Sequence, residues 1–314
     1  MKISIIVPCY NEQEALPLFY EELDKVTKQL SSYDFEMLFV DDGSKDKTME
    51  EIIKLADKDE RVKYISFSRN FGKESAMYAG FCNVTGDYAA VMDADMQDPP
   101  SLLPDMIKIL EEGEYDSVAT RRVSRKGEPF LRSLFAKMFY KIMNLISDTD
   151  LVSGARDFRL MKREMVDAIV NMCESSRFSK GIFGWIGFKT YWMEYKNVER
   201  VAGKTKWSFF SLFKYSLDGI VSFSVAPLKL CSLISTLVGL GSFGLFIYAL
   251  VETFAHGASF MGMPSLMSLV LFMASLQIFL IGIVGHYVGK TYNETKRRPH
   301  YIVAKTNKKD VVKK

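Results

Sequence analysis

Two long apolar stretches in the last third of this 314-residue chain limit its fold most strongly. The first, residues 230–251, contains no charged side chain, and the second, residues 266–288, has His286 as its only side chain that can carry a charge near neutral pH. Each stretch exceeds the roughly 20 residues that an α-helix needs to cross the hydrocarbon core of a bilayer. We therefore predict a transmembrane hairpin over residues 226–291, with a short loop at 252–264 between its two helices.

Basic residues flank this hairpin but are absent from its loop. Lys229 precedes the first stretch, and the tail at 292–314 is rich in Lys and Arg. The positive-inside tendency then places both ends of the chain in the cytoplasm and makes it a multi-pass protein of the cell membrane. A two-helix hairpin without charged residues favours an anchor over a small transporter, and it is compatible with a homo-oligomer.

Residues 207–225, just before the hairpin, combine aromatic and aliphatic side chains with charged ones. Trp207, Phe210 and Phe213 are interleaved with Lys214 and Asp218. This pattern predicts an amphipathic helix that lies in the membrane interface, and a core helix is the alternative.

The first half of the chain alternates short apolar runs with amphipathic stretches. Strands that are apolar throughout and alternate with helices are typical of a parallel sheet covered on both faces, so we predict an α/β domain over residues 1–206. The predicted strands are residues 3–7, 35–40, 62–67, 88–92 and 116–119, followed by 158–161 and 190–193. The predicted helices are residues 12–30, 47–56, 72–83, 102–111, 129–146 and 164–172.

Polar motifs follow three of these strands, where ligands bind in parallel sheets. The strongest is the segment 93–100 (DADMQDPP), in which Asp93 and Asp95 can share one hard cation. Oxygen ligands of this kind suit Mg²⁺ or Mn²⁺, which would neutralise charge on a departing nucleoside diphosphate. A solvated acidic turn is the alternative, but the buried strand before it and the DPP turn after it favour a metal site.

The other two motifs are suited to binding a nucleoside. Asp42, at the end of the second strand, could accept hydrogen bonds from a ribose or a base, or the segment could only form the turn before the next helix. In the first motif (PCYNE), Tyr10 could stack on a base and Glu12 could accept its N–H.

Together these motifs resemble the family-two glycosyltransferases, which have a nucleotide-sugar-binding GT-A fold. The resemblance is closest to dolichyl-phosphate mannosyltransferases and bactoprenol (undecaprenyl-phosphate) glucosyltransferases, and it covers nearly the whole chain. It implies that the nucleotide contacts fall on Pro8, Tyr10, Glu12, Val40 and Asp42. It places the diphosphate and metal contacts on Asp93, Ala94, Asp95, Gln97 and Arg121, with Asp93, Asp95 and Gln97 as the metal ligands.

Two later segments also fit this resemblance. The segment 156–161 (RDFRLM) is similar to a signature of the bacterial glucosyltransferases, which implies that Asp157 lies near the sugar or the acceptor phosphate and that Arg159 binds phosphate. Arg200 and Lys206, in a segment similar to the family's Arg…Gly-x-Ser-Lys, would hold donor or acceptor phosphates. Attraction of these basic residues to anionic lipid is the alternative.

The expected activity is an inverting transfer of a hexose from a nucleotide sugar to a polyisoprenyl phosphate at the cytoplasmic face of the membrane. The resemblance favours UDP-glucose and undecaprenyl phosphate, with N-acetylglucosamine, galactose and mannose still open. Asp157, Asp95 and Arg121 are the candidate catalytic residues. With a net charge of +3 and no dense basic stripe before the tail, we expect no nucleic-acid partner.

Two other functions remain as alternatives. A processive polysaccharide synthase shares the catalytic fold, but the sequence has no QxxRW motif and too few apolar stretches for a channel. A non-enzymatic sugar-nucleotide sensor or flippase scaffold would need no acidic metal motif, yet the motif at Asp93 and Asp95 is intact.

Overall fold

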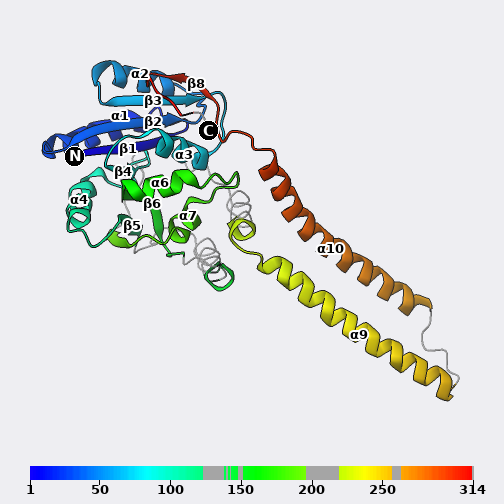
Figure 1. Ribbon diagram of the computed structural model, residues 1–314. Helices are drawn as coiled ribbons and strands as arrows, with labels where there is room; N and C mark the ends of the chain where they lie inside the picture. Colours follow the sequence, from blue (N-terminus) through cyan, green and yellow to red (C-terminus); the bar gives the residue numbers. More distant parts are fainter. Residues whose placement is uncertain are drawn as a thin grey trace. The chain divides into compact units, whose positions relative to one another are not determined.

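The structure, a computed structural model, divides into two units (Figure 1). Residues 1–222 and 298–314 form the first unit, and residues 223–297 form the second. The structure describes residues 1–122, 138, 141, 143–147, 151–195, 219–256 and 263–312.

The first unit is built on a mostly parallel sheet, as the sequence predicts. Among the described residues the sheet has eight strands, in the order β7-β5-β6-β4-β1-β2-β3-β8. Strand β1 pairs in parallel with both β2 and β4, whereas β6 and β8 run antiparallel to their neighbours. The strands are β1 (Lys2–Cys9), β2 (Asp34–Asp41), β3 (Val62–Phe67), β4 (Tyr88–Val91), β5 (Ser117–Arg122), β6 (Ala155–Lys162), β7 (Thr190–Tyr195) and β8 (Val303–Thr306).

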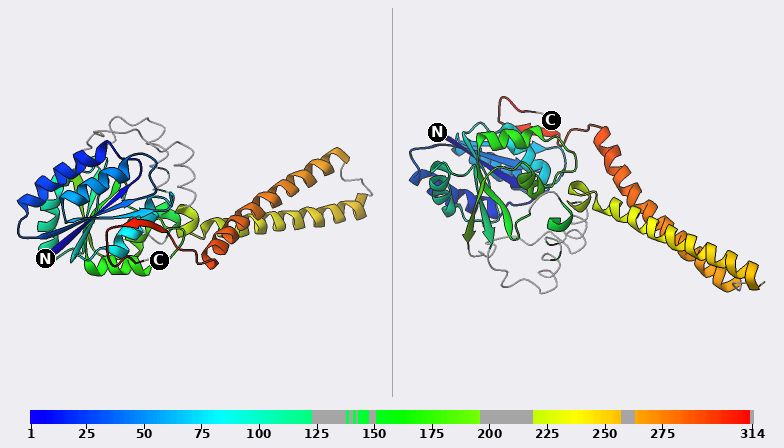
Figure 2. Two further views of the ribbon diagram at one scale, coloured as in Figure 1. Left: turned by 90° about the horizontal axis from the view of Figure 1, so that it is seen from above. Right: turned by 60° about the horizontal axis from the view of Figure 1, so that its bottom comes forward.

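Helices cover both faces of this sheet, which is why its central strands are apolar throughout (Figure 2). Ile5 of β1 belongs to the same buried cluster as Leu16 and Phe19 of α1. Its neighbour Ile6 faces the other way and packs against Gly80 of α3, where a Cβ atom would lie only 2.2 Å from the Ile6 side chain. The helices of this unit are α1 (Ala15–Gln29), α2 (Thr48–Lys58), α3 (Lys73–Asn83), α4 (Leu103–Glu111), α6 (Arg163–Asn171) and α7 (Ser179–Trp185).

The second unit consists of two long helices, α9 (Ala226–His256) and α10 (Met263–Thr295). Both are long and apolar enough to cross a membrane, with candidate spans at Ala226–Leu245 and Leu269–Thr295. They extend beyond the two predicted stretches at both ends. The predicted interfacial helix at 207–225 lies largely outside the described residues, as does most of the predicted helix at 129–146.

The C-terminal tail returns to the first unit, where the sequence predicts only a basic segment. Strand β8 covers the edge of β3, and edge strands that stay unpaired invite unwanted association. Lys308 contacts the buried Glu36 at 2.8 Å. Burial alone would raise the pKa of Glu36, but the hydrogen bond and charge of Lys308 outweigh it and lower that pKa to about 2.

Tyr301 fixes the start of the tail and gives a test of its contribution to stability. Its ring is 2% exposed and stacks on Phe67, with the centroids 5.0 Å apart. We expect Tyr301→Ala to lower the free energy of unfolding by about 3 kcal/mol, the usual cost of removing a buried aromatic ring. The neighbouring Ile302, which is 53% exposed, provides the matched control Ile302→Ala. Urea unfolding of the purified chain measures both, and equal midpoints would contradict a structural role for the tail.

Candidate active site

The three polar motifs lie at one edge of the sheet because β1 pairs in register with its two parallel neighbours. Pro8 pairs with Val40, and Cys9 pairs with Asp41. On the other side of β1, Ile6 pairs with Val91, directly before the acidic motif. The carboxyl ends of three strands therefore meet at one place, as the sequence predicts.

Hydrogen bonds between side chains and backbone hold the first two motifs together. The Asn11 backbone N–H donates to Ser44 Oγ at 2.9 Å, and the Lys45 N–H donates back to Asn11 Oδ1 at 2.8 Å. The Glu12 N–H donates to Thr48 Oγ1 at 2.7 Å. Asn11 has a φ of 53°, a left-handed conformation that Asn tolerates better than most residues. These contacts fix the backbone that carries Tyr10 and Glu12.

Asp42 is buried and binds the loop before α3. Its carboxylate accepts the backbone N–H of Phe71 at 2.6 Å and that of Gly72 at 2.9 Å. Burial outweighs these hydrogen bonds and raises the pKa of Asp42 to about 6. The next residue must be glycine, because a Cβ on Gly43 would lie 2.4 Å from the carbonyl carbon of Arg69. Asp42 thus joins the end of β2 to the start of α3.

The acidic motif after β4 turns back on itself and is held by β6 and β7. Asp95 Oδ1 accepts the Gln97 backbone N–H at 3.1 Å. Arg156 of β6 donates to Gln97 Oε1 at 3.2 Å and to Asp98 Oδ1 at 3.1 Å. The buried Asp98 also accepts the hydroxyl hydrogen of Tyr195. Burial raises the pKa of Asp98 despite the opposing charge of Arg156.

Lys73, the first residue of α3, connects two of the predicted site residues. Its ammonium nitrogen lies 2.8 Å from both carboxylate oxygens of Asp93 and 2.5 Å from Asp157 Oδ2. Burial favours the neutral forms of Asp157 and Lys73. The charge of Lys73 nevertheless holds the pKa of Asp157 below its ordinary range, and the two carboxylates raise that of Lys73. Asp157 and Lys73 therefore form a charged pair at neutral pH.

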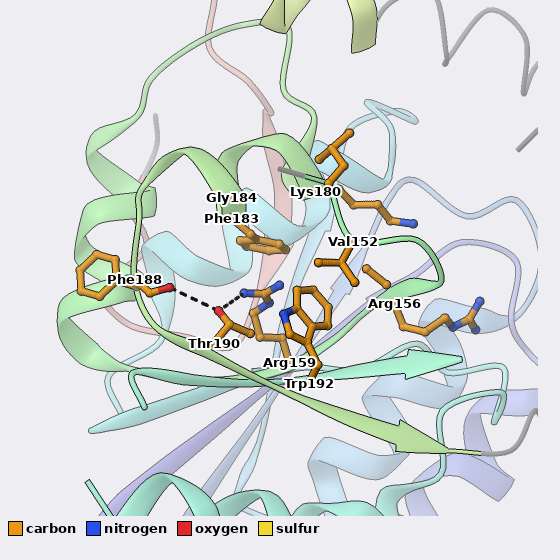
Figure 3. Close-up of a pocket in the computed structure, with 11 residues that line it drawn as sticks. Val152, Arg156, Arg159, Lys180, Phe183, Gly184, Phe188, Thr190 and Trp192 are labelled. Carbon is orange, nitrogen blue, oxygen red and sulfur yellow. Dashed lines mark hydrogen bonds between the residues drawn. The ribbon is translucent and has the colours of Figure 1, made fainter. Parts of the chain in front are cut away.

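A cavity of about 240 Å³ is lined by three cations, among them Arg156 and Arg159 of β6, and by several apolar side chains (Figure 3). At its base, Arg159 is 3% exposed and lies between the rings of Phe183 and Trp192, 4.5 and 5.3 Å from the two centroids. Burial lowers its pKa to about 9. Arg159 Nη1 donates to Ser117 and Thr190, but its buried Nε has no hydrogen-bond partner among the described residues.

The remaining predicted residues are placed as follows. Arg121 forms a partly exposed ion pair with Glu194 at 2.9 Å, and among the described residues no hydrogen bond or ion pair joins it to the acidic motif. Val40 and Ala94 have almost no exposed surface, so only their backbones could meet a ligand. Arg200 and Lys206 lie outside the described residues.

The oxygen atoms of the acidic motif suit a hard divalent cation, although they do not form a complete set of ligands. No group of three His, Cys, Asp or Glu side chains comes together within the described part of the chain. The residues present therefore fit a cation that takes its other ligands from water and substrate phosphates, as Mg²⁺ commonly does. Asp93, Asp95 and Gln97 are the residues that would hold it.

Four residues of the site were not predicted from the sequence: the cations Lys73 and Lys180 and the aromatic residues Phe183 and Trp192. A signal for Lys73 was present, because the segment 68–73 follows the third parallel strand and so reaches the same edge of the sheet. No comparable signal marks the cavity, whose lining comes from β6, α7, β7 and the loop before β6.

Two family models match the chain and cover its two units separately. The model "Glycosyl transferase family 2" matches residues 4–170. The model "GtrB C-terminal hairpin" matches residues 226–291. The first match spans the sheet from β1 through β6, and the second spans most of α9 and α10.

Several curated relatives match nearly end to end. Bacillus subtilis CsbB is 47% identical over 97% of this chain and 92% of its own length. An Escherichia coli protein named "Prophage bactoprenol glucosyl transferase homolog" is 41% identical over 98% of this chain and 100% of its own. The "Bactoprenol glucosyl transferase" of Shigella phage SfII is 39% identical, with coverages of 98% and 99%.

The raised pKa of Asp42 predicts how stability depends on pH. Below the unfolded-state pKa of about 4, the Asp42 carboxyl is protonated in both the folded and the unfolded state. Between about pH 4 and pH 6 the unfolded state loses this proton while the folded state keeps it, so the free energy of unfolding falls as the pH rises. The wild-type chain should therefore lose about 2 kcal/mol of unfolding free energy relative to Asp42→Asn between about pH 4 and pH 7.5.

Tryptophan fluorescence can follow this unfolding, because Trp185, Trp192 and Trp207 all precede the hairpin. Urea titrations of both proteins across this pH range measure the difference. A difference in unfolding free energy between the wild type and Asp42→Asn that stays the same at every pH would show that burial does not raise the pKa of Asp42.

Proposed function

The chain belongs to glycosyl transferase family 2, and from that premise we propose that it transfers glucose from UDP-glucose to undecaprenyl phosphate, with inversion. The observation that carries the proposal is the joint match of the catalytic family and the hairpin family to one chain, at 39–41% identity to proteins named as bactoprenol glucosyl transferases. Helices α9 and α10 would anchor the enzyme in the membrane that contains its acceptor, with the catalytic unit in the cytoplasm.

The donor would bind at the carboxyl ends of β1, β2 and β4. Tyr10 and Glu12 lie on the loop that Asn11 and Thr48 hold in place, and Asp42 lies at the end of the neighbouring strand. This arrangement suits a uridine whose base stacks on Tyr10 and whose base and ribose donate hydrogen bonds to Glu12 and Asp42. Asp93, Asp95 and Gln97 would hold Mg²⁺ or Mn²⁺, which would neutralise charge on the departing diphosphate.

The reaction requires little proton transfer from the protein. A phosphate monoester has a second pKa of about 6, so the acceptor is largely a dianion at neutral pH. One of its oxygens would form a bond to the anomeric carbon as the bond from that carbon to the UDP oxygen breaks. Because Lys73 holds the pKa of Asp157 low, this carboxylate is a weak base. We assign it to orienting the sugar and stabilising positive charge on the anomeric centre.

The cavity beside Asp157 is the best-supported location for the acceptor headgroup. Arg159 and Lys180 contribute two positive charges, Arg156 adds a third that is paired with Asp98, and no carboxylate is among the described residues that line the cavity. The rest of the lining is largely apolar, as an anionic group on a branched hydrocarbon chain requires. The unpartnered Nε of Arg159 is a further donor within this wall. Arg200 and Lys206 would extend the positive surface by the same chemistry.

A transfer assay tests the proposed reaction. Purified chain, undecaprenyl phosphate and Mn²⁺ are incubated with radiolabelled UDP-glucose or with other UDP- and GDP-sugars. We expect label in the lipid phase from UDP-glucose, and a loss of at least about a hundredfold in Asp95→Ala and Asp157→Asn, as for removal of one preorganised electrostatic group. Label from another sugar would correct the donor, and no transfer from any donor would favour the sensor alternative.

Lys180 tests the location of the acceptor, because it lies at the cavity and forms no ion pair within the described part of the chain. We expect Lys180→Met to raise the KM for the lipid phosphate about tenfold, which corresponds to one charge-assisted hydrogen bond. The KM for UDP-glucose should not change. The exposed Lys189 supplies the control Lys189→Met. An increase in the donor KM instead would place the cavity in the donor site.

A further inference from the structure

The contacts of Lys73 leave Asp93 fully engaged by a protein cation. Lys73 Nζ lies 2.8 Å from both oxygens of the Asp93 carboxylate, so a metal ion would have to displace the ammonium or share an oxygen with it. The same nitrogen lies 2.5 Å from Asp157 Oδ2. One ammonium group thus bridges a predicted metal ligand and a candidate catalytic carboxylate.

The position of this ammonium is determined by the backbone. Lys73 follows Gly72, whose φ of 98° suits glycine and whose N–H donates to Asp42. The loop before α3 is therefore held by the residue proposed to bind the nucleoside. From this start, the Lys73 side chain reaches across to Asp93, in the segment after β4, and to Asp157 of β6.

The charges explain why a cation is needed at this position. Asp93 and Asp157 have side chains only 23% and 18% exposed, and they meet at a single nitrogen atom. Without that nitrogen, two partly buried carboxylates would face each other with little water to screen them. A divalent cation beside Asp93 would remove the repulsion, but before it binds the protein must supply the positive charge itself.

We propose that Lys73 is a positioning residue that holds Asp157 in place and occupies Asp93 until a divalent cation takes that carboxylate. The inference rests on the metal dependence within the proposed function. When the cation binds, the ammonium gives up Asp93 and keeps Asp157. The catalytic carboxylate then remains fixed before and after the site is loaded.

Mn²⁺ titrations monitored by electron paramagnetic resonance test this exchange without donor or acceptor. Lys73→Met removes the competing charge, so we expect Mn²⁺ to bind at least about fivefold more tightly than to the wild type, because like charges a few ångströms apart repel strongly at a partly buried site. Lys73→Arg keeps the charge and should bind Mn²⁺ as the wild type does. Lys54→Met, on the exposed face of α2, controls for the change in net charge.

Unchanged or weaker Mn²⁺ binding by Lys73→Met overturns the proposal, as does the absence of Mn²⁺ binding by the wild type and every variant. Turnover by Lys73→Met should meanwhile fall in the transfer assay, although the metal binds more tightly. A folding defect in Lys73→Met would instead weaken Mn²⁺ binding and turnover together. Since the titration contains no substrates, its failure is distinguishable from a failure of glucose transfer.

A double variant guards against misfolding caused by the uncompensated, partly buried carboxylate pair that Lys73→Met leaves. Asp157→Asn removes the second negative charge, so Lys73→Met with Asp157→Asn leaves no repulsion. The double variant should bind Mn²⁺ more tightly than Asp157→Asn alone, because Asp93 is free of its competitor only in the former. Equal affinity of the two proteins would show that Lys73 does not compete for the site.

Discussion

The parallel register of β1 with β2 and β4 is the constraint on which the rest of the site depends. It brings Pro8 beside Val40 and leaves the loops after three strands at one edge of the sheet. Close packing of Gly80 on Ile6 then sets how α3 lies on that sheet. Because α3 begins at the same edge, its first residue reaches the carboxylates that follow β4 and line β6. A larger residue at position 80 would displace the helix and, with it, the cation at the centre of the site.

Two carboxylates beside the acidic motif have a partner of opposite sign, whereas a buried cation at the cavity does not. Asp98 is paired with Arg156, and Asp157 with Lys73, which offsets the cost of removing these groups from water. Arg159 has no ion pair of this kind among the described residues. The rings of Phe183 and Trp192 partly compensate for the missing ion pair through cation–π contacts. Burial of the charged guanidinium still lowers the pKa of Arg159. An anionic ligand in the cavity would supply the missing charge.

The sequence predicted the parts of this structure that depend on local pattern. Short apolar runs identify the strands, and the parallel topology that follows from their alternation with helices brings Asp42 and Asp93 to the same edge. Contacts between distant segments were not predictable in this way. Strand β8 joins β3 although Thr306 and Tyr64 are 242 residues apart, and a four-residue strand has too little pattern to identify. Arg159 was assigned from a motif alone, which could not show that two rings would bury it.

The C-terminal tail also contacts the loop that holds Asp42, close to the point where the chain returns from the hairpin. The chain enters the hairpin after residue 222 and rejoins the first unit at residue 298, so the catalytic unit is attached at both ends of α9–α10. The returning segment stacks Tyr301 on Phe67, and Phe67 in turn meets the edge of Phe71. The backbone N–H of Phe71 binds Asp42. The second attachment therefore contacts the same loop that binds Asp42 and precedes Lys73, through two ring contacts and one hydrogen bond.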